Sequence, residues 1–151
     1  MQKLIFTIVT ITTLFLMACN SNQSQTKKES LVKVNTDTIH IKNRLELYAF
    51  HGTRECATCK NMKANTKATL DKYFVNELKS GKIVYLIIDV DDKKNEKIAE
   101  KFQASGTALM INKVINGKDS IADWSQFAFD KADDVTKFIP ELKTKIEGVL
   151  K

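Results

Sequence analysis

A run of six apolar residues, Ile83 to Ile88, restricts the possible folds more than any other part of the chain. Most of its side chains are β-branched and no polar residue interrupts it, which predicts a strand buried on both faces of a parallel sheet. Upstream, residues 44–50 show the period-two alternation of a second, central strand. The two alternating sets are Leu45, Leu47, Ala49 and Glu46, Tyr48, Phe50.

Between these two segments, from about Cys56 to Gly81, a set of residues recurs at spacings of three and four. The set consists of the apolar residues Met62, Leu70, Tyr73, Phe74 and Leu78, with Thr66 and Thr69 filling the gap between the first two. This period predicts a helix, with a break around Leu70 and Asp71. A strand, a helix and a second strand in this order indicate a parallel crossover and therefore an α/β fold.

A helix and a hairpin of two strands are predicted after the second strand. Asp91 or Asp92 is expected to cap a helix that buries Ile98, Ala99 and Phe102. The Asn116-Gly117 pair then indicates a tight turn, because both residues tolerate a positive φ. It joins two predicted strands, at residues 108–111 and 120–124.

A final helix is expected from about Lys131 to the end of the chain. Its apolar face comprises Val135, Phe138, Ile139, Leu142, Ile146 and Val149. Pro140 lies within this pattern and is expected to kink the helix, because proline lacks a backbone donor and crowds the preceding turn.

Length and composition fit one folded domain. The 151 residues are 43% hydrophobic and 28% charged, with only five glycines and one proline. The net charge is +6, but the lysines are scattered from Lys27 to Lys151 among acidic residues. Nucleic-acid binding is therefore not expected, and the chain has no glycine-rich nucleotide loop and no His-Glu-x-x-His motif.

Residues 1–18 have the pattern of a secretion signal, with Lys3 followed by an apolar stretch that is shorter than the ~20 residues of a spanning helix. The sequence Leu16-Met17-Ala18-Cys19 resembles a bacterial lipobox, which implies cleavage before Cys19 and lipid attachment to its thiol. The alternatives are cleavage elsewhere, with Cys19 incidental, or an uncleaved anchor.

With lipidation, residues 19–43 would be a lipid-anchored tether and lead-in, because residues 20–30 have no apolar side chain to bury. The expected location is the cell envelope, outside the cytoplasm and attached to a membrane.

The remaining cysteines form the motif Cys56-Ala57-Thr58-Cys59 at the start of the first predicted helix. Cys56 would face free backbone amides and the positive end of the helix dipole, both of which lower a thiol pKa. Cys59, one turn later, would be more buried. In a disulfide exchange, Cys56 would then attack and Cys59 would resolve the mixed disulfide. Arg54 and Lys60 would favour the Cys56 thiolate, and Glu55 would oppose it.

The order strand, helix with Cys-x-x-Cys, strand, helix, hairpin, helix resembles the thioredoxin fold, over a domain at residues 44–151. The local matches are the junction before Cys56, residues 87–91 leading into 96–102, and Ser105-Gly106-Thr107 before the third strand. The junction is similar to that of a divergent bacterial lipoprotein subgroup. The resemblance implies a three-layer α/β fold, with a central mixed sheet flanked by helices.

The implied function is a membrane-anchored, extracytoplasmic thiol-disulfide oxidoreductase that exchanges disulfides with partner proteins and uses no cofactor. Cys56 and Cys59 would be the catalytic residues. Possible accessory residues are His51, Arg54, Glu55, Lys60, Thr107 and Ala108.

The sequence departs from the thioredoxin pattern at two positions. Ala108 stands where these proteins usually have a cis-proline, and Tyr48 falls at the position of a buried acid on the first strand. An alternative function is a soft-metal module that binds copper or zinc through the two cysteines, with His51 as a third ligand. A four-ligand zinc site would also need His40. His51 could instead assist proton transfer or form hydrogen bonds within its loop, and the cysteine pair could be a structural disulfide.

Overall fold

The computed structural model describes residues 43–151. The predicted signal peptide, Cys19, His40 and all of the predicted tether except Asn43 lie outside this range. Within residues 43–151, four strands and five helices follow one another, with a short 3-10 turn before the third helix. They are β1 (Asn43–His51), α1 (Ala57–Tyr73), α2 (Val75–Ser80), β2 (Ile83–Asp89), η1 (Lys93–Asn95), α3 (Glu96–Phe102), β3 (Ala108–Ile115), β4 (Lys118–Asp123), α4 (Ser125–Lys131) and α5 (Val135–Leu150).

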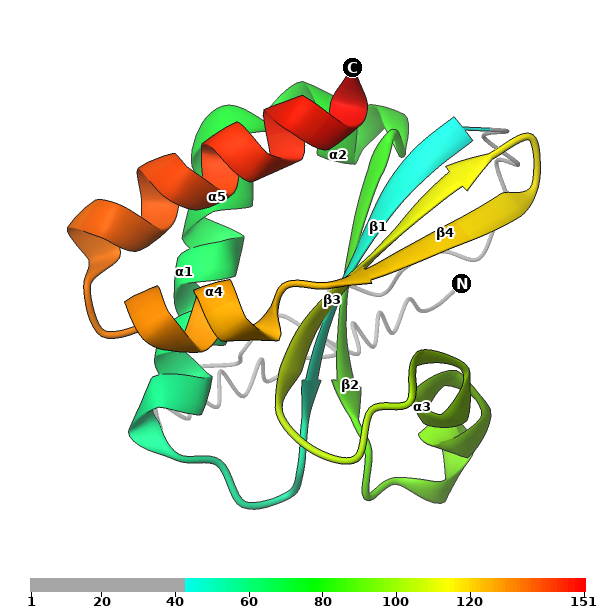
Figure 1. Cartoon of the computed structure of the whole chain (residues 1–151), viewed down its shortest axis with the longest axis vertical. Coiled ribbons are helices and arrows are strands. Elements are labelled where there is room, and N and C mark those ends of the chain that lie inside the picture. Colours follow the sequence, from blue (N-terminus) through cyan, green and yellow to red (C-terminus); the bar gives the residue numbers. More distant parts are fainter. Residues whose placement is uncertain (1–42) are drawn as a thin grey trace, which may run out of the picture. The chain divides into compact units, whose positions relative to one another are not determined.

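The strands form one mixed sheet in the order β2-β1-β3-β4 (Figure 1). β1 pairs in parallel with β2 and antiparallel with β3, so Leu47 lies between Tyr85 and Ile111. β3 and β4 form the predicted hairpin, and Asn116 and Gly117 both have positive φ, as a tight two-residue turn requires. The expected α/β fold with a mixed sheet is confirmed.

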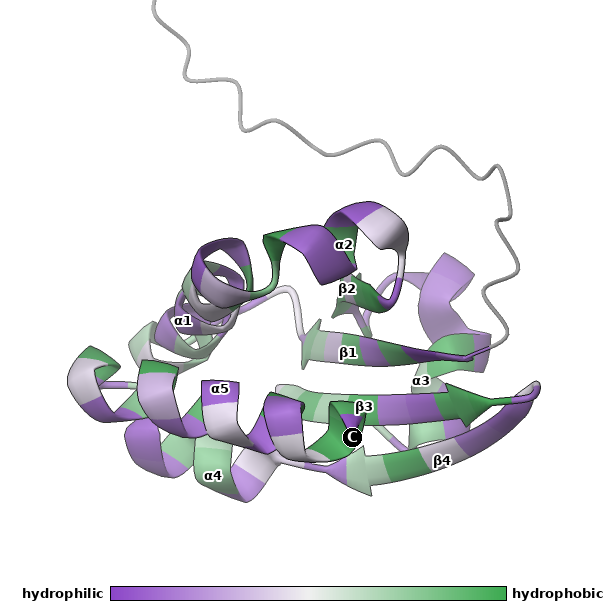
Figure 2. Cartoon of the chain, turned by 90° about the horizontal axis from the view of Figure 1, so that it is seen from above, coloured by the Kyte–Doolittle hydropathy of each residue, from purple (hydrophilic) through white to green (hydrophobic). Residues whose placement is uncertain are grey.

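Helices cover both faces of the sheet. Figures 1 and 2 show α1, α4 and α5 on one side and α3 on the other. The alternation along β1 explains this arrangement, because successive side chains of a strand point to opposite faces. Leu45 and Leu47 pack in the larger core cluster with Met62 and Phe138 of the helices. Tyr48 and Phe50 enter a smaller cluster with Phe102 of α3, so the predicted three layers are confirmed.

The prediction that β2 is buried on both faces is wrong. Among the strands of residues 43–151, β2 lies at the edge of the sheet, and Ile87 is 50% exposed. The apolar run of β2 has the pattern of a central strand, but the burial of a strand also depends on its place in the order of the sheet. Only Ile83 of this strand is fully buried.

Several helix boundaries also differ from expectation. The first helical segment breaks at Phe74 and not at Leu70 and Asp71. Asp92 caps the 3-10 turn η1 and not α3, which begins at Glu96 after its N-cap residue Asn95. Strand boundaries differ as well. β3 extends to Ile115, beyond the predicted end at residue 111, and β4 begins at Lys118, two residues earlier than predicted.

The C-terminal segment contains two helices where one was predicted. α4, which begins after Trp124, was not predicted. α5 begins at Val135, where Asp134 accepts bonds from the backbone N–H groups of Thr136 and Lys137. Phe138, Leu142 and Ile146 are buried as expected, but Val135 is 49% exposed because it lies in the first turn. α5 continues through the exposed Pro140 without a break.

Among residues 43–151, no helix is long and apolar enough to cross a membrane.

The buried Thr66 of α1 provides a stability test, because its hydroxyl has no hydrogen-bond partner within the described chain. Thr66→Val should raise the free energy of unfolding by about 1 kcal/mol, since it removes an unsatisfied buried polar group. The measurement is the urea midpoint at an unchanged m-value. Thr69→Val is the matched control, because the Thr69 hydroxyl donates to the Asn65 carbonyl at 2.7 Å. A lower midpoint for Thr66→Val than for Thr69→Val would contradict this prediction.

Candidate functional site

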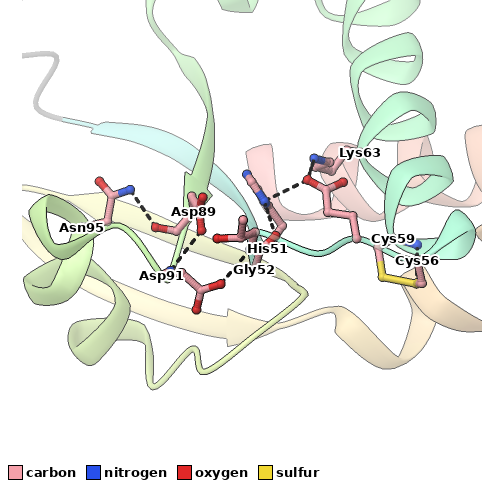
Figure 3. A network of polar contacts seen from close by, with 10 residues as sticks. His51, Gly52, Cys56, Cys59, Lys63, Asp89, Asp91 and Asn95 are labelled. Atoms are coloured by element: carbon pink, nitrogen blue, oxygen red, sulfur yellow. Dashed lines mark hydrogen bonds and ion pairs between the residues drawn. A yellow bond between two sulfur atoms is a disulfide. The ribbon is translucent and has the colours of Figure 1, made fainter.

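The Cys-x-x-Cys motif lies where the central strand β1 is followed by α1, the longest of the helices in residues 43–151. β1 ends at His51 and α1 begins at Ala57, with Cys56 as the N-cap residue in an extended conformation. Cys56 and Cys59 form a disulfide (Figure 3). The Cys56 sulfur also accepts a hydrogen bond from the backbone N–H of Cys59 at 3.1 Å. This sulfur therefore takes the place of the oxygen that usually caps a helix.

The two cysteines differ in burial. Cys56 is exposed, whereas Cys59 lies one turn further and is only 7% exposed. The expected difference in burial is thus present, and a partner molecule can reach Cys56 more easily than Cys59.

The loop between β1 and the motif is tied to the loop after β2. The Val90 N–H donates to the His51 carbonyl at 2.8 Å, and the Thr53 N–H donates to Asp91 Oδ2 at 2.7 Å. Gly52 allows this close approach, because a Cβ there would lie 3.2 Å from Asp91 Oδ2. The bonds from Thr53 lower the pKa of the Asp91 carboxyl. The acidic residues after β2 therefore have a structural role beside the cysteines.

A compact ion-pair cluster lies on the same loop. Glu55 Oε1 is 2.8 Å from His51 Nδ1 and 2.5 Å from Lys63 Nζ, which comes from α1 (Figure 3). Burial raises the pKa of the Glu55 carboxyl, but the hydrogen bond and charge of Lys63 and the charge of His51 outweigh it. That pKa therefore lies below its usual value. Sequence analysis proposed Glu55 and His51 but missed Lys63.

His51 forms hydrogen bonds within its own loop, which was one of the roles predicted for it. Its Nδ1 lies 2.9 Å from the Gly52 carbonyl and 2.8 Å from Glu55. Because both neighbours only accept hydrogen bonds, Nδ1 must carry the proton. Within residues 43–151, no three histidine, cysteine, aspartate or glutamate side chains form a group that could hold a metal ion. The structure thus does not bring His51 to the cysteines as a third ligand.

The helix that carries the motif is also fastened at its other side. Asp133, in the connection between α4 and α5, accepts bonds from the Thr58 hydroxyl at 3.1 Å and the Asn61 amide at 2.9 Å. Asn65 donates to the Ala132 carbonyl at 2.8 Å. Sequence analysis missed these contacts, because they join residues about 70 positions apart in the chain.

The other proposed accessory residues lie around the site without joining the cluster. Arg54 and Lys60 are exposed on either side of Cys56 in the chain. Thr107 and Ala108 are half-buried, and Ala108 begins β3 opposite Phe50 of β1. The position expected for cis-proline is therefore at the sheet end that leads to the motif.

β1 contains a buried acidic residue, but it is Glu46 and not a residue at the position of Tyr48, where the thioredoxin pattern has its acid. Glu46 is 6% exposed and accepts bonds from the Tyr48 hydroxyl at 3.0 Å and the Asn112 amide at 2.9 Å. Burial, together with the Glu46 charge and its hydrogen bond, raises the pKa of Tyr48. The alternation of β1 placed Glu46 on the α3 side, but only the folded chain supplies its partners.

No protein-family model and no curated protein matches the chain. Several solved structures are similar to it. Fasciola hepatica thioredoxin is 22% identical, with 69% of this chain and 82% of that chain covered and a TM-score of 0.42. Thioredoxin O2 from Arabidopsis thaliana in its oxidised state is 15% identical, with coverages of 72% and 76% and a TM-score of 0.44. The thioredoxin pre-protein of Schistosoma mansoni is 25% identical, with coverages of 65% and 82% and a TM-score of 0.38.

The chain's own topology identifies its fold. The sheet order β2-β1-β3-β4, the parallel crossover through α1 and the Cys-x-x-Cys disulfide at the start of that helix make it a thioredoxin-like fold. This arrangement supports thiol-disulfide exchange in general.

The tie between Asp91 and the loop leads to a prediction. Asp91→Ala should increase the hydrogen-exchange rate of the Thr53 amide about tenfold or more, because a charge-assisted bond is lost. The measurement is amide exchange by NMR. Because the pKa of Asp91 is lowered in the folded protein, the bond contributes stability above the unfolded-state pKa. In the wild type, protection of Thr53 should therefore be present at neutral pH and fall below pH about 4.

Asp92→Ala is the control for this experiment, since Asp92 caps η1 through the Lys94 N–H. It should leave Thr53 exchange unchanged. Equal exchange rates in the two variants would show that Asp91 does not hold the loop.

Proposed function

We propose that this protein is a membrane-anchored, extracytoplasmic thiol-disulfide oxidoreductase that exchanges disulfides with partner proteins through Cys56 and Cys59. The observation that carries the proposal is the disulfide between an exposed N-cap cysteine and a buried cysteine one turn later. An exchange reaction needs one sulfur that a partner can reach and a second that can release the partner.

In the oxidised protein, a partner thiolate attacks the Cys56 sulfur. A bond forms between these two sulfurs, the Cys56–Cys59 bond breaks, and its electron pair leaves on the Cys59 sulfur, which then takes a proton. A second thiolate of the partner attacks the partner's sulfur in the mixed disulfide and displaces Cys56. The partner is oxidised by two electrons to a disulfide, and the protein is reduced to a dithiol.

The reverse reaction uses the same atoms. The Cys56 thiolate attacks a partner disulfide, and the Cys59 thiolate then attacks the Cys56 sulfur and releases the reduced partner. The backbone N–H of Cys59, 3.1 Å from the Cys56 sulfur, and the dipole of the 17-residue α1 both stabilise negative charge on Cys56. The direction of the net reaction depends on the potential of the partner.

The membrane anchor is proposed from the sequence. Leu16-Met17-Ala18-Cys19 provides the lipid-attachment motif, and the polar residues 20–30 separate it from the folded domain. Because residues 20–30 have no apolar side chain, we propose that they serve as a tether, which would let the site approach partners near the membrane.

The roles of the two cysteines can be tested by trapping. Cys59→Ser should accumulate mixed disulfides with partner proteins, because the resolving thiol is missing, whereas Cys56→Ser should accumulate none. The measurement is non-reducing electrophoresis of the membrane fraction, followed by mass spectrometry of the linked peptides. Cys56→Ser trapping as many partners as Cys59→Ser would overturn the assignment of roles, and trapping by neither variant would overturn the exchange function.

The anchor has a separate test. Mass spectrometry of the membrane fraction should find Cys19 as the new N-terminus, with a diacylglycerol group on its sulfur. Cys19→Ala should release the protein from the membrane or leave the precursor uncleaved. An unmodified Cys19 in the mature wild-type protein, from cells with a working lipoprotein pathway, would rule out the proposed anchor.

A further inference from the structure

Glu55 presents an electrostatic problem for Cys56. It directly precedes Cys56, and a carboxylate beside a thiol disfavours the thiolate that disulfide exchange requires. The Glu55 side chain is only 13% exposed, so solvent screens its charge less than it would screen a charge on the surface. A sequence with an unneutralised acid at this position would have a less reactive Cys56.

Lys63 is placed to neutralise this acid. Its ammonium lies 2.5 Å from Glu55 Oε1, and its side chain is only 17% exposed. The position of Lys63 is itself supported, because its carbonyl accepts a bond from the Tyr85 hydroxyl of β2 at 3.2 Å. The Tyr85 bond thus supports the backbone of Lys63, and the Lys63 ammonium joins α1 to Glu55 in the loop before Cys56.

His51 binds the same carboxylate oxygen from the end of β1, at 2.8 Å. It cannot replace Lys63, because its Nδ1 proton is shared between Glu55 and the Gly52 carbonyl. Lys60 also lowers the pKa of Glu55 through its charge, but it is exposed. Among these groups, Lys63 alone combines the shortest contact, partial burial and an ammonium charge.

We propose that Lys63 is a positioning residue for the exchange reaction: it binds and neutralises Glu55, and so allows Cys56 to act as the attacking sulfur despite the adjacent acid. Glu55 in turn ties the loop to α1. The inference rests on the proposed function and names the residue that sets the reactivity of its nucleophile.

A double-mutant cycle tests this inference in the reduced, full-length protein. The variants are Glu55→Gln, Lys63→Met and the two combined. The rate of iodoacetamide labelling is followed against pH by quantifying the Cys56 peptide in a mass spectrometer, which separates it from Cys19 and Cys59. The midpoint of each profile gives the pKa of the Cys56 thiol.

Lys63→Met should raise this midpoint by on the order of one pH unit, because Glu55 would then act on Cys56 without compensation. Labelling at pH 7 would slow by about tenfold. In the Glu55→Gln background, the same Lys63→Met change should alter labelling less than about twofold, and Lys63→Arg should keep the wild-type midpoint.

Lys67→Met is the matched control, because Lys67 forms an exposed ion pair with Asp71 on the same helix. It should not move the midpoint. Circular dichroism checks that each variant is folded, and if Lys63→Met does not fold, Lys63→Gln replaces it in the cycle.

Two outcomes would overturn the inference. One is a Lys63→Met effect of equal size with and without Glu55, which would mean that Lys63 acts on Cys56 directly. The other is an unchanged midpoint in Lys63→Met. Both would leave the proposed function intact, whereas the absence of mixed disulfides in the trapping experiment would overturn that function whatever the thiol pKa.

Discussion

The structure depends on β1 having hydrogen-bonded neighbours on both sides along nearly all of its length. Residues 45–51 pair with β2, and residues 43–50 pair with β3. The alternating side chains of this central strand enter both core clusters, through which helices pack on the two faces of the sheet. The pairing of β1 also fixes where the strand ends, and therefore where Cys56 meets the start of α1.

The chemistry of the site follows from this junction and from the contacts that hold it. The Asp91 carboxylate ties the preceding loop to the end of β2, and Asp133 ties the first turn of α1 to the α4 and α5 connection. Between them, the exposed Cys56 caps the helix and Cys59 turns into the protein. These contacts fix the positions of the exposed Cys56 and the buried Cys59, which are joined as a disulfide.

Sequence patterns predicted those features of the fold that depend on residues close together in the chain. The Asn116-Gly117 turn, the alternation of β1 and the helix that begins beside Cys56 were all readable from the sequence, because backbone preference and side-chain period set them. The exposed edge at Ile87 was not, since burial of a strand depends on the order of the whole sheet. Lys63 and Asp133 were missed for a similar reason: only folding brings them to the motif.

The most direct test of the account is the reduction potential of the Cys56–Cys59 pair, measured in the folded protein against thiol-disulfide buffers. A pair that exchanges disulfides should show one reversible two-electron transition without loss of structure, at a value between about −270 and −120 mV, the range of proteins that exchange disulfides. A potential below about −300 mV, or reduction that occurs only when the protein unfolds, would identify a structural disulfide and contradict the account.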